Sequence, residues 1–176
     1  MLKQISLLIL CAVAIVLFAT PVHACTSAVV SGKVTLDGRP LLWKNRDTDF
    51  MRNHVDYVKG ERYDFIAVVN SANAYLKEAW MGTNSAGFAL MNTQSYNLVD
   101  VKGDEERGAA NGRVIYRALE VCATVEDFCH FLDTISKPSD IEANFGVIDA
   151  QGGAAMFEVD YYKYVMYDAN NPKDAP

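Results

Sequence analysis

The chain has 176 residues and a formal net charge of −6, with 51% hydrophobic and 22% charged residues. An acidic chain of this kind argues against nucleic acid or an anionic membrane surface as a partner. Its length is sufficient for one domain with a sizeable hydrophobic core.

The first 24 residues are typical of a secretory signal peptide. Lys3 supplies a positive charge, an apolar run follows from Ile5 to Ala19, and the segment ends in small residues at Ala24. The run is about 15 residues long, shorter than the ~20 that a membrane span needs, so no stable membrane span is expected. We therefore predict a signal peptide over residues 1–24 and one mature domain over residues 25–176, secreted or periplasmic.

Strand patterns dominate the first part of the mature domain. β-branched and apolar residues over Thr26–Ser31, a turn at Leu36–Pro40 and a second apolar run at Leu41–Lys44 predict a hairpin. Further strands are expected at Phe65–Val69, Leu76–Met81 and Phe88–Asn92.

The middle of the chain changes to helical spacing. Apolar residues predict one helix over Arg113–Cys122, and a second helix begins after Thr124, with Asp127 placed as in a capping box and Pro138 as the expected end. Strands resume at Phe145–Asp149, Ala154–Val159 and Tyr164–Tyr167. This order predicts an α+β layered domain with the helices packed on a mostly antiparallel sheet.

The cysteine count points to one unusual thiol. Cys11 is removed with the signal peptide. The mature chain then keeps Cys25, Cys122 and Cys129, an odd number of cysteines in an oxidising compartment. On one continuous helix Cys122 and Cys129 would be roughly 10 Å apart, too far to form a disulfide. They can form a disulfide only if the helix is interrupted between them. The alternative is that both are buried free thiols.

Cleavage after Ala24 would make Cys25 the new N-terminus. A free α-amine has a pKa of about 7.7–8.0, so it can serve as the base for a thiol on the same residue. This chemistry requires no histidine, metal or cofactor. The alternative is a lipidated cysteine, whose acylated amine would no longer act as a base.

Several blocks of the sequence resemble the cysteine N-terminal-nucleophile hydrolases. These blocks are Cys25–Gly38, Trp43–Asp47, Gly82–Asn92 and Asn144–Asp149. The nearest groups are the acyl-CoA:6-aminopenicillanic acid acyltransferase-like proteins, the choloylglycine (bile salt and penicillin V) hydrolases and the secreted dipeptidases. The resemblance implies a four-layer αββα sandwich and attack on linear amide bonds. Relatives continue beyond a segment like Tyr167–Pro172, so we expect the C-terminal part of the sandwich to be lacking.

The same resemblance implies roles for five residues. Asp47 would lie beside the amine of Cys25, and the side-chain amide of Asn92 would stabilise the oxyanion. The hydrolases usually carry Arg where Lys44 stands, and Arg46 lies two residues further on the same strand face. Either cation would favour the thiolate of Cys25. Without these roles, the charged cluster is a solvated hairpin end and Asn92 is a strand-end residue in a turn.

The function expected from the resemblance is cleavage of a small-molecule amide through a thioester, or transfer of the acyl group to another amine. Two other hypotheses remain open at this stage: a lipid-anchored surface domain that serves binding, and a truncated family member without catalysis. The sequence does not predict an oligomeric state.

Overall fold

The computed structural model describes residues 25–95 and 108–174. Its strands are β1 (Thr26–Val30), β2 (Leu41–Asn45), β3 (Asn53–Val58), β4 (Phe65–Asn70), β5 (Met81–Asn84), β6 (Ala89–Gln94), β7 (Ala143–Ile148), β8 (Ala154–Val159) and β9 (Tyr164–Asp168). Its helices are α2 (Asn111–Val121) and α3 (Val125–Asp133), with short 3-10 turns at η1 (Gly32–Val34) and η2 (Ala74–Leu76). The last seven strands form one antiparallel sheet in sequence order, and β1 pairs with β2 in a second sheet.

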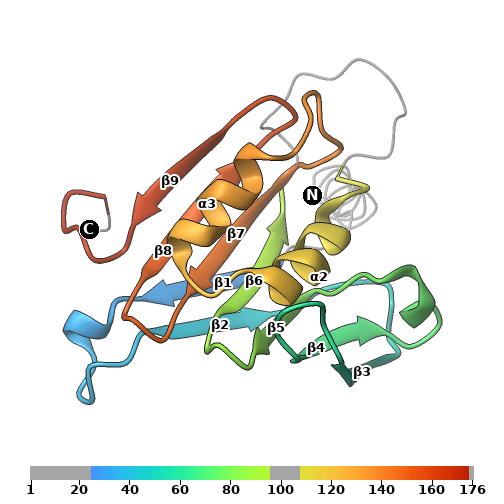
Figure 1. Ribbon diagram of the computed structural model, residues 1–176, viewed down its shortest axis with the longest axis horizontal. Helices are drawn as coiled ribbons and strands as arrows, with labels where there is room; N and C mark the ends of the chain where they lie inside the picture. The colour runs from blue at the N-terminus through green and yellow to red at the C-terminus, as the bar shows by residue number, and fades with distance from the viewer. Residues whose placement is uncertain (1–24, 96–107, 175–176) are drawn as a thin grey trace, which may run out of the picture.

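The two sheets and the helices form three layers (Figure 1). Phe145 of β7 points to the helices, where its ring centroid lies 5.8 Å from that of Phe128 in α3. The next residue, Gly146, faces Val29 and Leu42 of the hairpin, as expected because successive residues of a strand point to opposite faces. The order helix, sheet, sheet matches the predicted sandwich. A second helical layer, outside the hairpin, is not found among the described residues.

The main hydrophobic core lies between the seven-stranded sheet and the two helices. Phe128 is central to it, with its ring centroid 5.1 Å from Phe157 and 5.8 Å from Phe145, both in edge-on geometry. All three side chains are fully buried. Among the described residues, no helix is long and apolar enough to cross a membrane.

The predicted start of α3 is confirmed, whereas its predicted end is wrong. The Thr124 hydroxyl accepts a hydrogen bond from the backbone N–H of Asp127, and the Asp127 carboxylate accepts one from the backbone N–H of Thr124. The helix ends at Asp133, well before Pro138, and the Thr134 hydroxyl donates to the Phe131 carbonyl of the last turn.

Two other expectations fail between β3 and β5. The predicted strand over Leu76–Met81 is wrong: Lys77 adopts a left-handed backbone (φ 54°), and β5 begins only at Met81. The backbone N–H of Ala79 instead donates to Gly112 of α2 at 3.0 Å, so a helix competes for this segment. Conversely, β3 was not predicted, because its alternation is limited to Val55 and Tyr57, which lie exposed on an edge strand.

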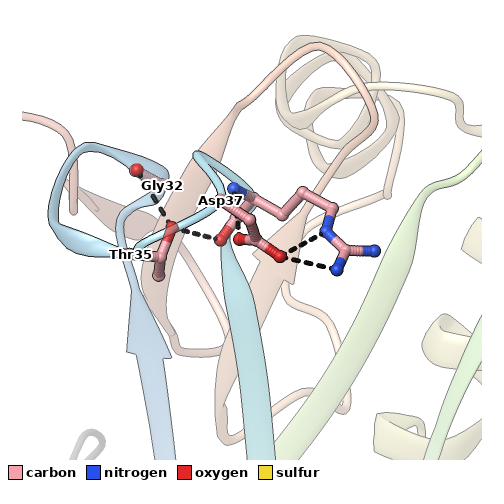
Figure 2. A network of polar contacts seen from close by, with 4 residues as sticks. Gly32, Thr35 and Asp37 are labelled. Carbon is pink, nitrogen blue, oxygen red and sulfur yellow. Dashed lines mark hydrogen bonds and ion pairs between the residues drawn. The ribbon is translucent and has the colours of Figure 1, made fainter.

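The predicted hairpin is confirmed, with Ser27 opposite Lys44. Its connection is closed by local polar contacts around Thr35 and Asp37 (Figure 2). The Thr35 hydroxyl lies 3.0 Å from the Gly32 carbonyl oxygen and 2.8 Å from that of Arg39. The Asp37 carboxylate accepts hydrogen bonds from the backbone and guanidinium of Arg39, which lower the pKa of Asp37. This connection sets the register that places Cys25 beside the end of β2.

Candidate active site

Cys25 lies at the start of β1, next to the end of β2. Because Thr26 pairs with Asn45, continuing the register places Cys25 opposite Arg46 and on the same hairpin face as Lys44. The Cys25 thiol donates to the backbone carbonyl of Asp47, with Sγ and O 3.5 Å apart. The residue is only half-buried, so the thiol is accessible to a reactant.

The Lys44 ammonium joins the hairpin to the seven-stranded sheet. Its Nζ donates to the carbonyl oxygen of Trp80 at 2.9 Å and to Oδ1 of Asn92 at 3.0 Å. Met81 and Met91 form the last pair of the β5–β6 ladder in this direction, so Trp80 and Asn92 are the next residue on each side. Lys44 therefore bridges the two strands where their own pairing stops.

Burial and nearby charge alter the ionisation of both cations. Desolvation lowers the pKa of Lys44 to about 8, assisted by Arg46 and opposed by the charge of Cys25. Desolvation likewise lowers the pKa of Arg46, and the Cys25 charge again acts in the opposite direction. Both cations therefore lie within electrostatic range of Cys25.

The Arg46 guanidinium is held by three residues that the sequence analysis did not identify. Nη2 donates to Oδ1 of Asn70 at 2.9 Å, Nη1 donates to Oδ1 of Asn53, and Cζ lies 5.0 Å from the ring centroid of Trp80. Asn70 shared one sequence signal with Asn92, since each follows an apolar run in a strand. Asn53 and Trp80 carried no such signal.

Asn92 lies at the buried end of this cluster and is 3% exposed. Its carbonyl oxygen faces Lys44, and within the described part of the chain no group accepts a hydrogen bond from its Nδ2. The predicted residues Cys25, Lys44, Arg46 and Asn92 thus belong to one connected cluster.

Asp47 is exposed, and its backbone carbonyl accepts the hydrogen bond from the Cys25 thiol. A role for the carboxylate at the α-amine stays a prediction. No group of three or more His, Cys, Asp or Glu residues in the described ranges is arranged to hold a metal ion.

The two other mature cysteines occupy different environments. Both Cys122 and Cys129 are free thiols, so the disulfide alternative is not adopted. Burial raises the pKa of Cys122 to about 12, and burial together with Asp133 raises the pKa of Cys129. Arg62 and Arg117 act on Cys122 in the opposite direction but do not offset its burial, and no cation of the described residues acts on Cys129.

The Gly-Thr-Asn block that carried part of the resemblance serves a structural role here. Nδ2 of Asn84 donates to the carbonyl oxygens of Leu119 at 2.9 Å and Cys122 at 2.7 Å, at the end of α2. Its Oδ1 accepts from the backbone N–H groups of Ala86 and Phe88, and Gly87 takes a positive φ of 81°. The turn therefore anchors β5 and β6 to α2.

Comparison with solved structures returns proteins of low identity. A variant of the conjugated bile acid hydrolase from Clostridium perfringens matches with a TM-score of 0.57 and 15% identity, over 82% of this chain and 50% of that chain. A second variant of that hydrolase matches with a TM-score of 0.56 and 15% identity, over 81% of this chain and 50% of that chain. Penicillin V acylase from Agrobacterium tumefaciens matches with a TM-score of 0.39 and 18% identity, over 82% of this chain and 40% of that chain. The chain thus spans about half the length of the hydrolase, whose fold it shares.

No curated protein matches this chain. The family model described as acyl-coenzyme A:6-aminopenicillanic acid acyl-transferase, in contrast, matches residues 35–171. The match begins after Cys25 and includes Lys44, Arg46, Asp47 and Asn92. Since it covers most of the sequence, the chain belongs to the acyl-coenzyme A:6-aminopenicillanic acid acyl-transferase family.

Proposed function

We propose that this protein is an acylase that cleaves linear amide bonds, with the thiol of Cys25 as nucleophile. The observation that carries the proposal is the position of that thiol, half-buried at the start of β1 and in the electrostatic range of Lys44 and Arg46. Two cations beside a thiol favour the reactive thiolate. The fold shared with a conjugated bile acid hydrolase and the family membership support the same reaction class.

The reaction requires that Cys25 begin the mature chain. Its α-amine then accepts the thiol proton, and the sulfur attacks the amide carbonyl carbon to form a tetrahedral oxyanion. The C–N bond breaks as the ammonium returns its proton to the leaving amine, which leaves a thioester on Cys25. Water, with its proton passing to the α-amine, releases a carboxylic acid and the thiol. An amine in place of water would complete an acyl transfer.

Asn92 has the geometry to stabilise the oxyanion of both steps. Its Oδ1 is occupied by Lys44, and the proposal assigns its two N–H groups to the oxyanion. Donors held in place before the reaction stabilise charge that exists only in the transition state.

The acyl and amine groups of the substrate would be identified by testing a panel of amides. Release of amine from bile acid conjugates, penicillin V, N-acyl amino acids and dipeptides would be measured with mature protein that begins at Cys25. Cys25→Ala and Cys25→Ser should lower turnover by about a thousand-fold or more, as removal of a nucleophile does elsewhere. Cys129→Ser removes another partly accessible thiol and should leave turnover unchanged.

Two further measurements test the role of the N-terminus. A form that retains Ala24 before Cys25 lacks the free α-amine at the thiol and should lose turnover comparably. N-terminal sequencing and intact mass of the secreted protein should give Cys25 as an unmodified first residue. A diacylglyceryl addition on Cys25, or equal turnover in all the variants, would contradict the proposal.

A further inference from the structure

The contact between Lys44 and Asn92 determines which way the Asn92 amide points. Nζ of Lys44 lies 3.0 Å from Oδ1 of Asn92 and 2.9 Å from the carbonyl oxygen of Trp80. An ammonium has three donors and no acceptor, so it can pair with the oxygen of an amide but not with its NH₂ group. The reversed rotamer of Asn92 would place two donors against three donors.

This orientation matters because Asn92 is almost fully buried. At 3% exposure, its amide has little water to compensate for a wrong orientation. With Oδ1 committed to Lys44, Nδ2 has no acceptor among residues 25–95 and 108–174. A held, unpaired donor of this kind is what stabilisation of an oxyanion requires, since the enzyme then spends no free energy on reorientation during the reaction.

We infer that Lys44 is a positioning residue, whose ammonium holds Oδ1 of Asn92 so that Nδ2 faces the developing oxyanion. The inference deepens the proposed function and rests on Asn92 as the oxyanion donor. It differs from a direct effect of Lys44 on the thiolate of Cys25, because it acts on rate through a second side chain.

The hold on Asn92 depends on the proton of Lys44. A neutral amine also carries a lone pair, so it can accept a hydrogen bond from Nδ2 and no longer excludes the reversed amide. Desolvation brings the pKa of Lys44 to about 8; Arg46 lowers it and the Cys25 thiolate raises it, and in the mature chain the α-amine of Cys25 is a further ionisable neighbour. The partners from the seven-stranded sheet, Trp80 and Asn92, do not titrate. The orientation should therefore be lost as pH rises through about 8.

A double-mutant cycle separates the two roles. In the mature protein, Lys44→Met should lower kcat by roughly 10²-fold with KM nearly unchanged, the usual loss for one oxyanion donor. Lys44→Arg keeps a donor-only cation and should restore most of kcat. In an Asn92→Ala background, Lys44→Met should have little further effect. The control Lys163→Met replaces an exposed lysine and should not change kcat.

An effect of Lys44→Met that is equally large with and without Asn92 would overturn the inference and leave a direct effect on the thiolate. The pH dependence provides a second criterion. The kcat of the wild type should decline above about pH 8, and Lys44→Arg should move this decline to higher pH because Arg stays charged. An unchanged profile in Lys44→Arg would also contradict the positioning role.

Nuclear magnetic resonance of the side-chain amide gives a readout without substrate. The two Asn92 amide protons, assigned by their absence in Asn92→Ala, should shift with a midpoint near pH 8 in wild type and not in Lys44→Arg. This measurement needs no destabilising variant. If the amide titrates while no amide substrate is cleaved, the proposed function fails and the positioning contact stands. If cleavage occurs without the titration, the positioning inference fails alone.

Discussion

The two faces of the seven-stranded sheet are covered in different ways. On the helix side, side chains such as Leu90, Phe145 and Phe157 are 0% exposed. On the hairpin side, β1 and β2 cover only part of the sheet, and Ile66 remains 46% exposed beside a groove of about 410 Å³. The site cluster lies at the hairpin, whose Lys44 reaches Asn92 of β6 and whose Arg46 reaches Asn70 of β4.

This difference separates the source of stability from the source of reactivity. The helix side buries apolar area, which is the main favourable term in folding. The hairpin side holds Lys44 and Arg46 in positions where desolvation lowers the pKa of each, a cost that the rest of the fold must offset. Substitutions on the two faces should therefore affect different properties.

The largest effect is expected on the helix side. Phe157→Ala removes a fully buried ring that stacks edge-on against Phe128, and should lower the free energy of unfolding by about 3–5 kcal/mol. Chemical denaturation would measure this loss. At temperatures where the variant stays folded, alkylation of Cys25 by iodoacetamide should proceed at the wild-type rate. A changed alkylation rate would show that the two faces are coupled.

A substitution on the hairpin side of the sheet should change the reactivity of Cys25 as well as the stability. Gly146 has no positive φ, but a Cβ there would overlap the side-chain ends of Met91, Val29 and Leu42. Gly146→Val should therefore displace the hairpin and cost about 1–3 kcal/mol, as overpacking does. The alkylation rate of Cys25 should change in this variant. Unchanged thiol reactivity would mean that the hairpin tolerates the added volume without moving.

The last prediction concerns the pH dependence of stability. With a folded-state pKa of about 8, Lys44 is largely neutral in the folded protein above that pH, whereas in the unfolded chain it stays protonated to about 10.5. The unfolded state then binds more protons, so stability increases with pH over this interval. The gain is at most about 1.4 kcal/mol for each pH unit.

Denaturation of the wild type and Lys44→Met between pH 7.5 and 10 isolates this contribution, because other titrating groups act in both proteins. The difference in free energy of unfolding should shift in favour of the wild type as pH rises. A constant difference would indicate that Lys44 keeps an ordinary pKa. It would contradict the claim that desolvation on the hairpin side lowers the pKa of Lys44.

Much of the fold followed from local patterns. The helical spacing of α2 and α3, the capping box at Thr124 and the hairpin of β1 and β2 were all predicted, because each depends on residues close in sequence. β3 and the segment before β5 were not, because the apolar alternation of β3 is short and exposed, and because the backbone N–H of Ala79 bonds to α2 instead of to a strand.

The sequence by itself determined the hairpin and the shared strand face of Lys44 and Arg46, since alternate residues of a strand point to one side. That Cys25 lies beside them was implied by the family resemblance. Only the tertiary structure decided that Lys44 reaches Asn92 and that Trp80, Asn53 and Asn70 surround Arg46. These contacts join separate strands across two sheets. Their geometry depends on how the layers pack and where the β5–β6 ladder ends, which no local spacing in the sequence encodes.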